Sequence, residues 1–132
     1  MCNINIQVKR IYESSDENDG LRVLVDRLWP RGISKEKANL DLWCKDIAPS
    51  SDLRKWFGHK SERFEEFANR YIEELDENQD CVNQIVDICR KNKKVTFLYG
   101  AKDLRINHAI VLKDYIQTVS YTHLTLPTNR EV

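Results

Sequence analysis

The chain alternates short strand-like patterns with amphipathic helical ones. Ile4, Ile6 and Val8 alternate with polar residues, which predicts a first strand with one buried face. The nearly continuous apolar run at 21–25 predicts a second strand that is buried on both faces. Residues 95–99 form a third compact apolar run and predict another strand.

Helical periodicity fills most of the remaining chain. The polar segment Glu13–Gly20 ends in Asp-Gly and is typical of a surface loop, whereas Leu40–Ile47 is ambiguous and allows a short strand. Predicted helices are a turn at Ser34–Ala38 capped by Ser34, a helix carrying Leu53, Trp56 and Phe57 that ends at Gly58, a helix capped by Ser61 that reaches Leu75, and helices at Cys81–Arg90 and Ala109–Gln117. Strands that alternate with helices predict a single-domain, layered α/β fold with a mostly parallel sheet flanked by helices.

Composition narrows the class of protein. The 132 residues suit one domain with one core, and the 41% hydrophobic and 32% charged content is that of a folded globular chain. Lysine plus arginine and aspartate plus glutamate both number 21, so net charge gives no argument for nucleic-acid binding. No segment resembles a signal peptide or a membrane span, so we expect a cytoplasmic protein.

The cysteines and the glycine-rich motifs offer little chemistry. Cys2, Cys44, Cys81 and Cys89 match neither a CxxC nor a zinc-ligand spacing, so we interpret them as small packing residues. The chain has no Walker-type loop, no GxGxxG and no nucleophile elbow. The sequence therefore assigns no metal ligands and identifies no cofactor, although Asp26 and Asp103 could help to hold a divalent metal.

The C-terminal segment differs from the rest. Residues Val119–Thr128 match the translation of a transposon end that is used as a sequencing-library adapter. We therefore interpret residues 1–117 as the domain and residues 118–132 as a non-native tail, which takes no part in the functional reasoning.

Candidate chemistry gathers after two of the predicted strands. Asp26–Gly32 follows the strand at 21–25, and Gly100–His108 follows the strand at 95–99. In an open parallel sheet, ligands bind outside the carboxyl ends of the strands. If these two strands are parallel neighbours, both segments reach the same crevice.

The residue types in these segments suit an anionic ligand. Arginine guanidinium groups bind phosphate or carboxylate in a bidentate manner, and carboxylate and imidazole groups can transfer protons. The catalytic candidates are Asp26, Asp103 and His108, and the substrate-binding candidates are Arg27, Trp29, Arg31, Tyr99, Lys102 and Asn107.

A structural interpretation competes with the functional one. Asp26–Arg27 and Asp103–Lys102 could be ion pairs that fix loops, and His108 could be a core histidine bonded to a backbone carbonyl. Asn107 is most simply a helix N-cap, and Trp29 is most simply a packing anchor.

The run Leu24–Gly32 resembles the signature of the YeaO-like branch of the domain-of-unknown-function family 488. Further matches are Trp43 with Ala48-Pro49-Ser50, Leu53-Arg54 with Trp56-Phe57, and Leu98–Asp103 with Asn107-His108-Ala109, so that the resemblance covers Ile4 to Gln117. It implies an α/β fold and an uncharacterised function that leaves an enzymatic role open. The wider family often carries cysteines and a Cys-His-Arg motif near the second segment. Here Tyr99–Asp103 has no cysteine and Asn107-His108 keeps only the histidine, so thiol chemistry is not carried over.

Three hypotheses follow for function. The first is a small enzyme that acts on a phosphate- or carboxylate-bearing substrate in the charged crevice. The second is a non-catalytic module that binds a small anion or nucleic acid, although zero net charge weighs against broad nucleic-acid binding. The third is a structural or partner-binding protein. The sequence does not specify the oligomeric state.

Overall fold

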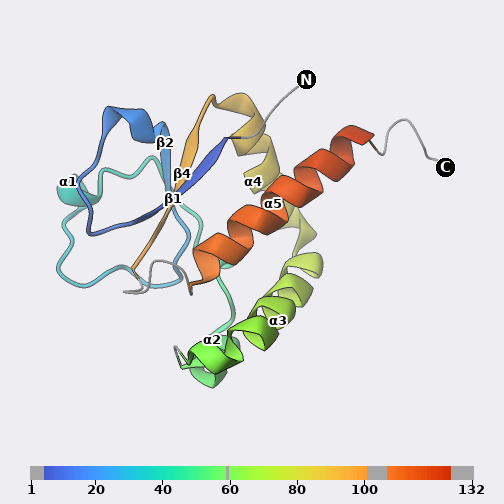
Figure 1. The fold of residues 1–132 in the computed structure, drawn as a ribbon. Coiled ribbons are helices and arrows are strands. Elements are labelled where there is room, and N and C mark those ends of the chain that lie inside the picture. The colour runs from blue at the N-terminus through green and yellow to red at the C-terminus, as the bar shows by residue number, and fades with distance from the viewer. Residues whose placement is uncertain (1–4, 59, 101–106, 126–132) are drawn as a thin grey trace.

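The computed structural model describes residues 5–58, 60–100 and 107–125, with side chains described up to residue 119. Its described part contains one four-stranded parallel sheet (Figure 1). In spatial order the strands are β1 (Ile6–Arg10), β4 (Val95–Tyr99), β2 (Leu21–Leu24) and β3 (Leu42–Trp43). The predicted α/β fold with a parallel sheet is therefore confirmed.

Helices cover the two faces of the sheet unequally. One face carries α3 (Phe64–Asp76), α4 (Gln79–Lys91) and α5 (His108–Thr125), with α2 (Ser51–Phe57) packed beside α3. The other face carries the short α1 (Lys35–Ala38) and long connecting segments (Figure 1). Three 3₁₀ turns complete the described elements: η1 (Glu17–Asp19), η2 (Lys45–Ile47) and η3 (Ser61–Arg63).

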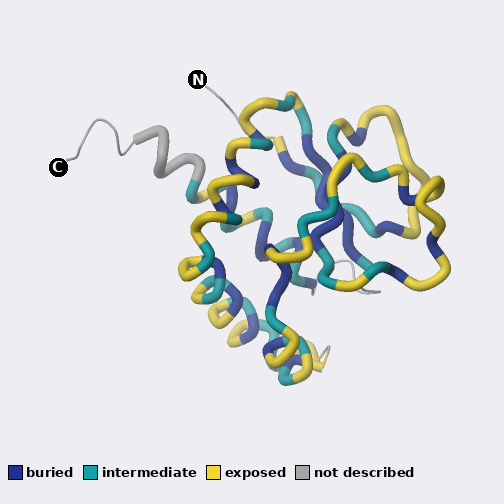
Figure 2. The backbone as a smooth tube through the Cα atoms, turned by 180° about the vertical axis from the view of Figure 1, so that it is seen from behind, coloured by how far each residue is buried: buried dark blue, intermediate teal, exposed yellow. Residues whose placement is uncertain are grey.

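The sheet separates two clusters of buried side chains. On the helical face, alternate residues of the central strands, such as Val23 and Phe97, pack against Tyr71 and Leu112. The intervening Leu24 and Leu98 point to the opposite face and form the smaller cluster. Figure 2 shows the central strands β2 and β4 as continuously buried stretches, whereas the helices are buried along one side only.

Several local predictions are confirmed, and one is wrong. The Ser34 side chain accepts a hydrogen bond from the backbone N–H of Lys37, and Gly58 ends α2 with a left-handed backbone. Ser61, however, does not cap α3, because it lies within η3 and α3 begins only after Arg63. The last helix continues beyond Gln117, so no change of element marks the boundary predicted there, which stays a prediction.

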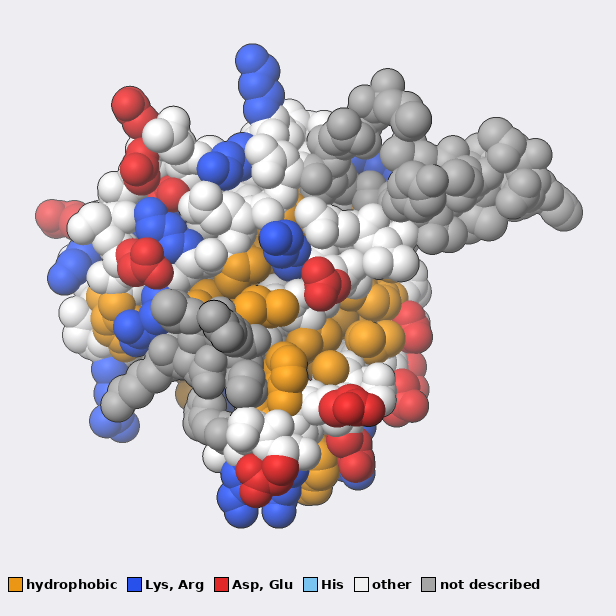
Figure 3. Space-filling view, in the orientation of Figure 1, with side chains coloured by type: hydrophobic (Ala, Val, Ile, Leu, Met, Phe, Trp, Pro, Cys, Tyr) orange, Lys and Arg blue, Asp and Glu red, His pale blue; other side chains and the backbone are white. Residues whose placement is uncertain are grey.

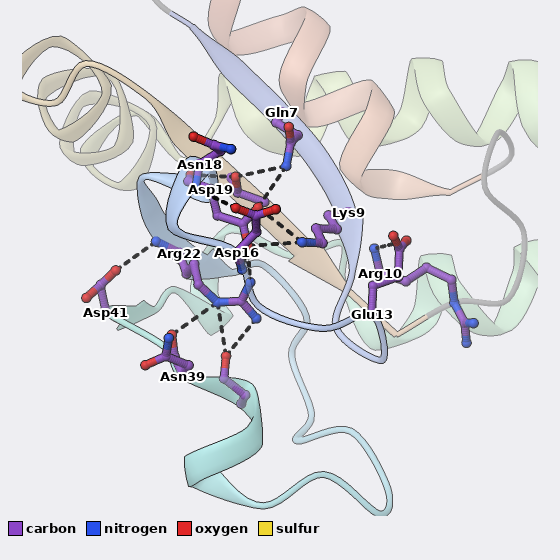
Figure 4. A network of polar contacts seen from close by, with 12 residues as sticks. Gln7, Lys9, Arg10, Glu13, Asp16, Asn18, Asp19, Arg22, Asn39 and Asp41 are labelled. Carbon is purple, nitrogen blue, oxygen red and sulfur yellow. Dashed lines mark hydrogen bonds and ion pairs between the residues drawn. The ribbon is translucent and has the colours of Figure 1, made fainter.

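The segment predicted as a surface loop carries a buried charge. Asp19 is 1% exposed and forms ion pairs with Lys9 and Arg22 beneath β1 and β2 (Figure 4). Arg22 also donates to the backbone carbonyls of Ala38 and Asn39. This network covers part of the sheet face against which no long helix packs. Within the described residues, no helix combines the length and apolar character needed to cross a membrane.

Candidate functional site

The parallel pairing of β2 and β4 brings the two candidate segments together. Leu24 lies opposite Leu98, so that Asp26 and Gly100 follow at matching positions beyond the strand ends. The backbone N–H of Gly100 donates to Oδ2 of Asp26 at 2.7 Å. A Cβ atom at position 100 would lie 3.1 Å from that oxygen, so a glycine permits this close approach.

His108 completes the contact from the first residue of α5. Its Nε2 lies 3.0 Å from Oδ1 of Asp26 and 3.0 Å from the carbonyl oxygen of Val25. Because a carbonyl oxygen can only accept, Nε2 carries the hydrogen and donates it to Val25. Oδ1 of Asp26 is therefore a buried acceptor that receives no aligned hydrogen bond from the described residues.

Two tryptophans fix the backbone around this contact. Nε1 of Trp43 donates to the carbonyl oxygen of Asp26, and Nε1 of Trp29 donates to the carbonyl oxygen of Ile33, both at 2.7 Å. The two indole rings meet edge to face with centroids 5.4 Å apart. Trp29 thus anchors the loop from inside, as the structural interpretation predicted.

The two arginines of the motif lie in different environments. The Arg27 guanidinium donates to the backbone carbonyls of Ala48 and Pro49 at 3.2 and 3.4 Å. Arg31 is exposed, and its backbone carbonyl accepts a hydrogen bond from the Tyr12 hydroxyl at 3.0 Å. The Asp26–Arg27 ion pair that the structural interpretation allowed is not formed, and Asp26 instead contacts His108.

Sequence reasoning missed Tyr71 of α3. Its ring meets that of His108 edge to face with centroids 6.2 Å apart, and its hydroxyl donates to the carbonyl oxygen of Ile47 at 2.7 Å. Burial raises the pKa of this phenol well above its ordinary value, and the carboxylates of Glu74 and Asp26 raise it further. In the sequence, Tyr71 is one apolar position on a helical stripe, which carries no sign of this contact.

The remaining candidates have different locations. The side chain of Asn107 caps α5 by accepting from the backbone N–H of Ile110 at 3.1 Å, as predicted. Tyr99 is 1% exposed within the core, which removes it from the surface that a ligand could reach. Lys102 and Asp103 lie outside the described residues. Among the residues that are described, no group of three histidine, cysteine, aspartate or glutamate side chains is placed to hold a metal ion.

Comparison with known proteins identifies the family. Residues 5–124 match a family model described as the inactive DUF488-N3 subclade. The uncharacterized protein YeaO of Escherichia coli K12 is 42% identical over 116 residues, which are 88% of this chain and 100% of YeaO. The uncharacterized protein Rv3073c of Mycobacterium tuberculosis H37Rv is 57% identical over 70 residues, which are 53% of this chain and 59% of that protein. No solved structure matches. The chain therefore belongs to the DUF488 family, in its YeaO-like branch.

Proposed function

We propose that this DUF488-family chain binds a small phosphate- or carboxylate-bearing ligand at the carboxyl edge of its sheet, without converting it. The observation that carries the proposal is the way in which His108 is held. Its Nε2 is occupied by the carbonyl oxygen of Val25 and lies beside Asp26, so within the described part of the chain Nδ1 is the ring nitrogen left for a ligand. The His108 side chain keeps 13% of its surface exposed.

The surroundings of His108 favour an anion. His108 is the first residue of an 18-residue helix, and the free backbone N–H groups at such a terminus attract negative charge. When the imidazole is protonated, Nδ1–H becomes an additional donor. The exposed Arg31 follows Pro30, whose Cβ lies 4.0 Å from where a Cβ at position 100 would be, and its guanidinium group is the cation that we assign to the ligand.

The other polar groups of the motif position this edge. Arg27 is held by two backbone carbonyls, and Asp26 accepts the Gly100 N–H while lying against His108. A carboxylate in this place holds negative charge beside the imidazole, whose Nε2 is bonded to Val25. This use of Asp26, together with the description of the matching family as inactive, favours binding over turnover.

Calorimetric titration of the full chain with inorganic phosphate, pyrophosphate, citrate and adenosine monophosphate tests the proposal. We expect at least one of these ligands to bind, and Arg31→Gln to weaken that binding about tenfold or more, because a charge-assisted hydrogen bond is worth about 1.5–3 kcal/mol. Lys93→Gln is the matched control, since Lys93 is exposed but precedes β4 at the opposite edge of the sheet. Both variants should melt like the unmodified chain.

Two results would contradict the proposal. One is that none of the four ligands binds. The other is a ligand whose affinity is unchanged in both Arg31→Gln and His108→Gln, because that ligand would bind elsewhere. If Asp26→Asn also lowered the melting temperature strongly while no ligand bound, the motif would serve the fold alone.

An enzyme acting on the same class of ligand is the second candidate function. The contact between the Asp26 carboxylate and the His108 imidazole favours it, since such a pair can move a proton between a bound substrate and solvent. Turnover of a bound ligand that is lost in His108→Gln, while binding persists, would establish this function instead. Unchanged ligand after prolonged incubation would support binding alone.

A further inference from the structure

The outer edge of β1 presents backbone groups that the described part of the sheet does not use. The N–H of Val95 donates to the carbonyl of Asn5, and the N–H of Ile11 donates to the carbonyl of Tyr99. Backbone groups alternate in direction along a strand, so the odd-numbered residues of β1 face β4. The N–H and C=O groups of Ile6 and Val8 therefore point away from the sheet.

One end of this edge is closed by the chain itself. Glu13 accepts a hydrogen bond from the backbone N–H of Arg10 at 3.3 Å and donates its own N–H to the Arg10 carbonyl at 3.1 Å. A clamp of this kind protects an edge strand from further pairing. No described residue forms such hydrogen bonds with the backbone of Ile6 or Val8. The part of the edge that is open for pairing is therefore short and centred on these two residues.

A groove of about 520 Å³ runs along the open part, between β1 and α5. It is lined by Asn5, Ile6, Gln7 and Val8 at β1, by Lys94 before β4, and by Ile110, Lys113 and Asp114 on α5. Figure 3 shows hydrophobic side chains in this region, bordered by basic and acidic ones.

The α5 side of the groove carries one cation and one anion, and Lys94, which precedes β4, adds a second cation. Ile110, Lys113 and Asp114 have the spacing that places residues on one face of a helix. Within the described part of the chain, neither Lys113 nor Asp114 forms an ion pair. The α5 side of the groove thus combines an apolar residue with one cation and one anion.

We propose that this surface binds a second copy of the chain, with the two β1 strands antiparallel across a two-fold axis at Gln7. In this register Ile6 lies opposite Val8 of the partner subunit, and each such pair exchanges both of its backbone hydrogen bonds. The two sheets become one continuous sheet, and both α5 helices lie on the same face of it beside the axis. Lys113 of each subunit then meets Asp114 of the partner subunit.

Self-complementarity selects a second copy over an unrelated partner. In a two-fold interface the same surface is used by both subunits. If one residue contacts a second residue on the partner subunit, the reverse contact between the same two residues also forms. The neighbouring Lys113 and Asp114, the apolar Ile110 and an edge strand that pairs with itself meet this requirement.

Sedimentation equilibrium of the full chain over a range of concentrations tests the dimer. Lys113→Asp and Asp114→Lys should each raise the dissociation constant about tenfold or more, because each places like charges together across the axis. The double variant, which exchanges the two charges, should return the constant toward its original value. An equimolar mixture of the single variants should form a heterodimer.

Proline substitutions test the strand pairing separately. Val8→Pro removes an outward N–H and should abolish the dimer while the subunit stays folded, since edge strands tolerate proline at such positions. Gln7→Pro removes an N–H that faces β4 and should destabilise the subunit itself. A chain that is monomeric throughout, or a dimer that neither Val8→Pro nor the single charge reversals weaken, would overturn the proposal.

Discussion

The buried carboxylate of Asp19 provides the sharpest test of what stabilises the fold. Lys9 Nζ lies 3.1 Å from both of its oxygens, and Arg22, which is almost fully buried, pairs with one of them. Replacing Asp19 by alanine leaves both cations without their counter-charge. Breaking a buried ion pair in this way costs about 3–5 kcal/mol, whereas a domain is stable by about 5–15 kcal/mol in total.

Urea unfolding followed by circular dichroism measures this loss directly. In a thermal scan of a chain of this length, the same loss should lower the melting temperature of Asp19→Ala by roughly 10–20 °C. The Arg70–Glu66 pair on α3 is the matched control, because its two side chains are 48% and 55% exposed. Glu66→Ala should cost less than about 0.5 kcal/mol. Equal losses in the two variants would refute the reasoning from burial.

The same carboxylate should contribute to acid unfolding. Burial by itself raises the pKa of Asp19, but hydrogen bonds from Lys9, the Asp16 backbone N–H and Arg22 outweigh it, so the pKa lies below its ordinary value of 3.8. A carboxyl group with a lowered folded-state pKa stabilises the fold above its unfolded pKa, and this contribution is lost as the pH falls through the folded value. Below about pH 4, the original chain should therefore lose stability more steeply than Asp19→Asn. Parallel pH profiles would contradict this assignment.

Three further predictions concern other features of the fold. Gly20→Ala places a Cβ 2.2 Å from a backbone carbonyl oxygen at φ +66°, and should cost roughly 2–4 kcal/mol in urea unfolding, whereas Gly32→Ala, with no atom within 4 Å, should cost only about 1–2 kcal/mol. Tyr71→Phe removes a buried hydrogen bond to a carbonyl and should lower the unfolding free energy by about 1–3 kcal/mol in the same assay. Burial raises the pKa of Cys89 to about 12 and that of Cys44 to about 11, so alkylation at pH 8 followed by mass spectrometry should label Cys89 only after unfolding and Cys44 slowly.

The periodicity of the chain predicted its elements well where a local pattern determines them. The strand Val95–Tyr99 has the predicted bounds, because four apolar residues and Thr96 form a compact run between polar segments. The order of strands in the sheet was not predicted. It places β4, the last strand in sequence, between the first two, and it depends on contacts between residues far apart in the chain.

The buried ion pair shows where local patterns fail. Asp19-Gly20 has the composition of a solvated turn, and the structure does place a turn there. Asp19 is buried together with its partner Arg22, which lies inside a strand predicted to be covered on both faces. An arginine in such a strand needs a counter-charge nearby, and the aspartate three residues earlier was the available signal.

In the candidate site, too, some contacts could be predicted from the sequence and others could not. Asp26, Gly100 and His108 meet because parallel strands end at one edge of a sheet, a rule that needs only the order of the elements. The roles of the arginines could not be predicted in this way. Arg27 and Arg31 belong to one short string, yet Arg27 is held by carbonyls more than 20 residues away, whereas Arg31 is exposed. Whether a charged side chain at a strand end serves the fold or a ligand thus depends on which distant backbone groups it can reach. For this reason, substitution of Arg31, and not of Arg27, separates the two roles.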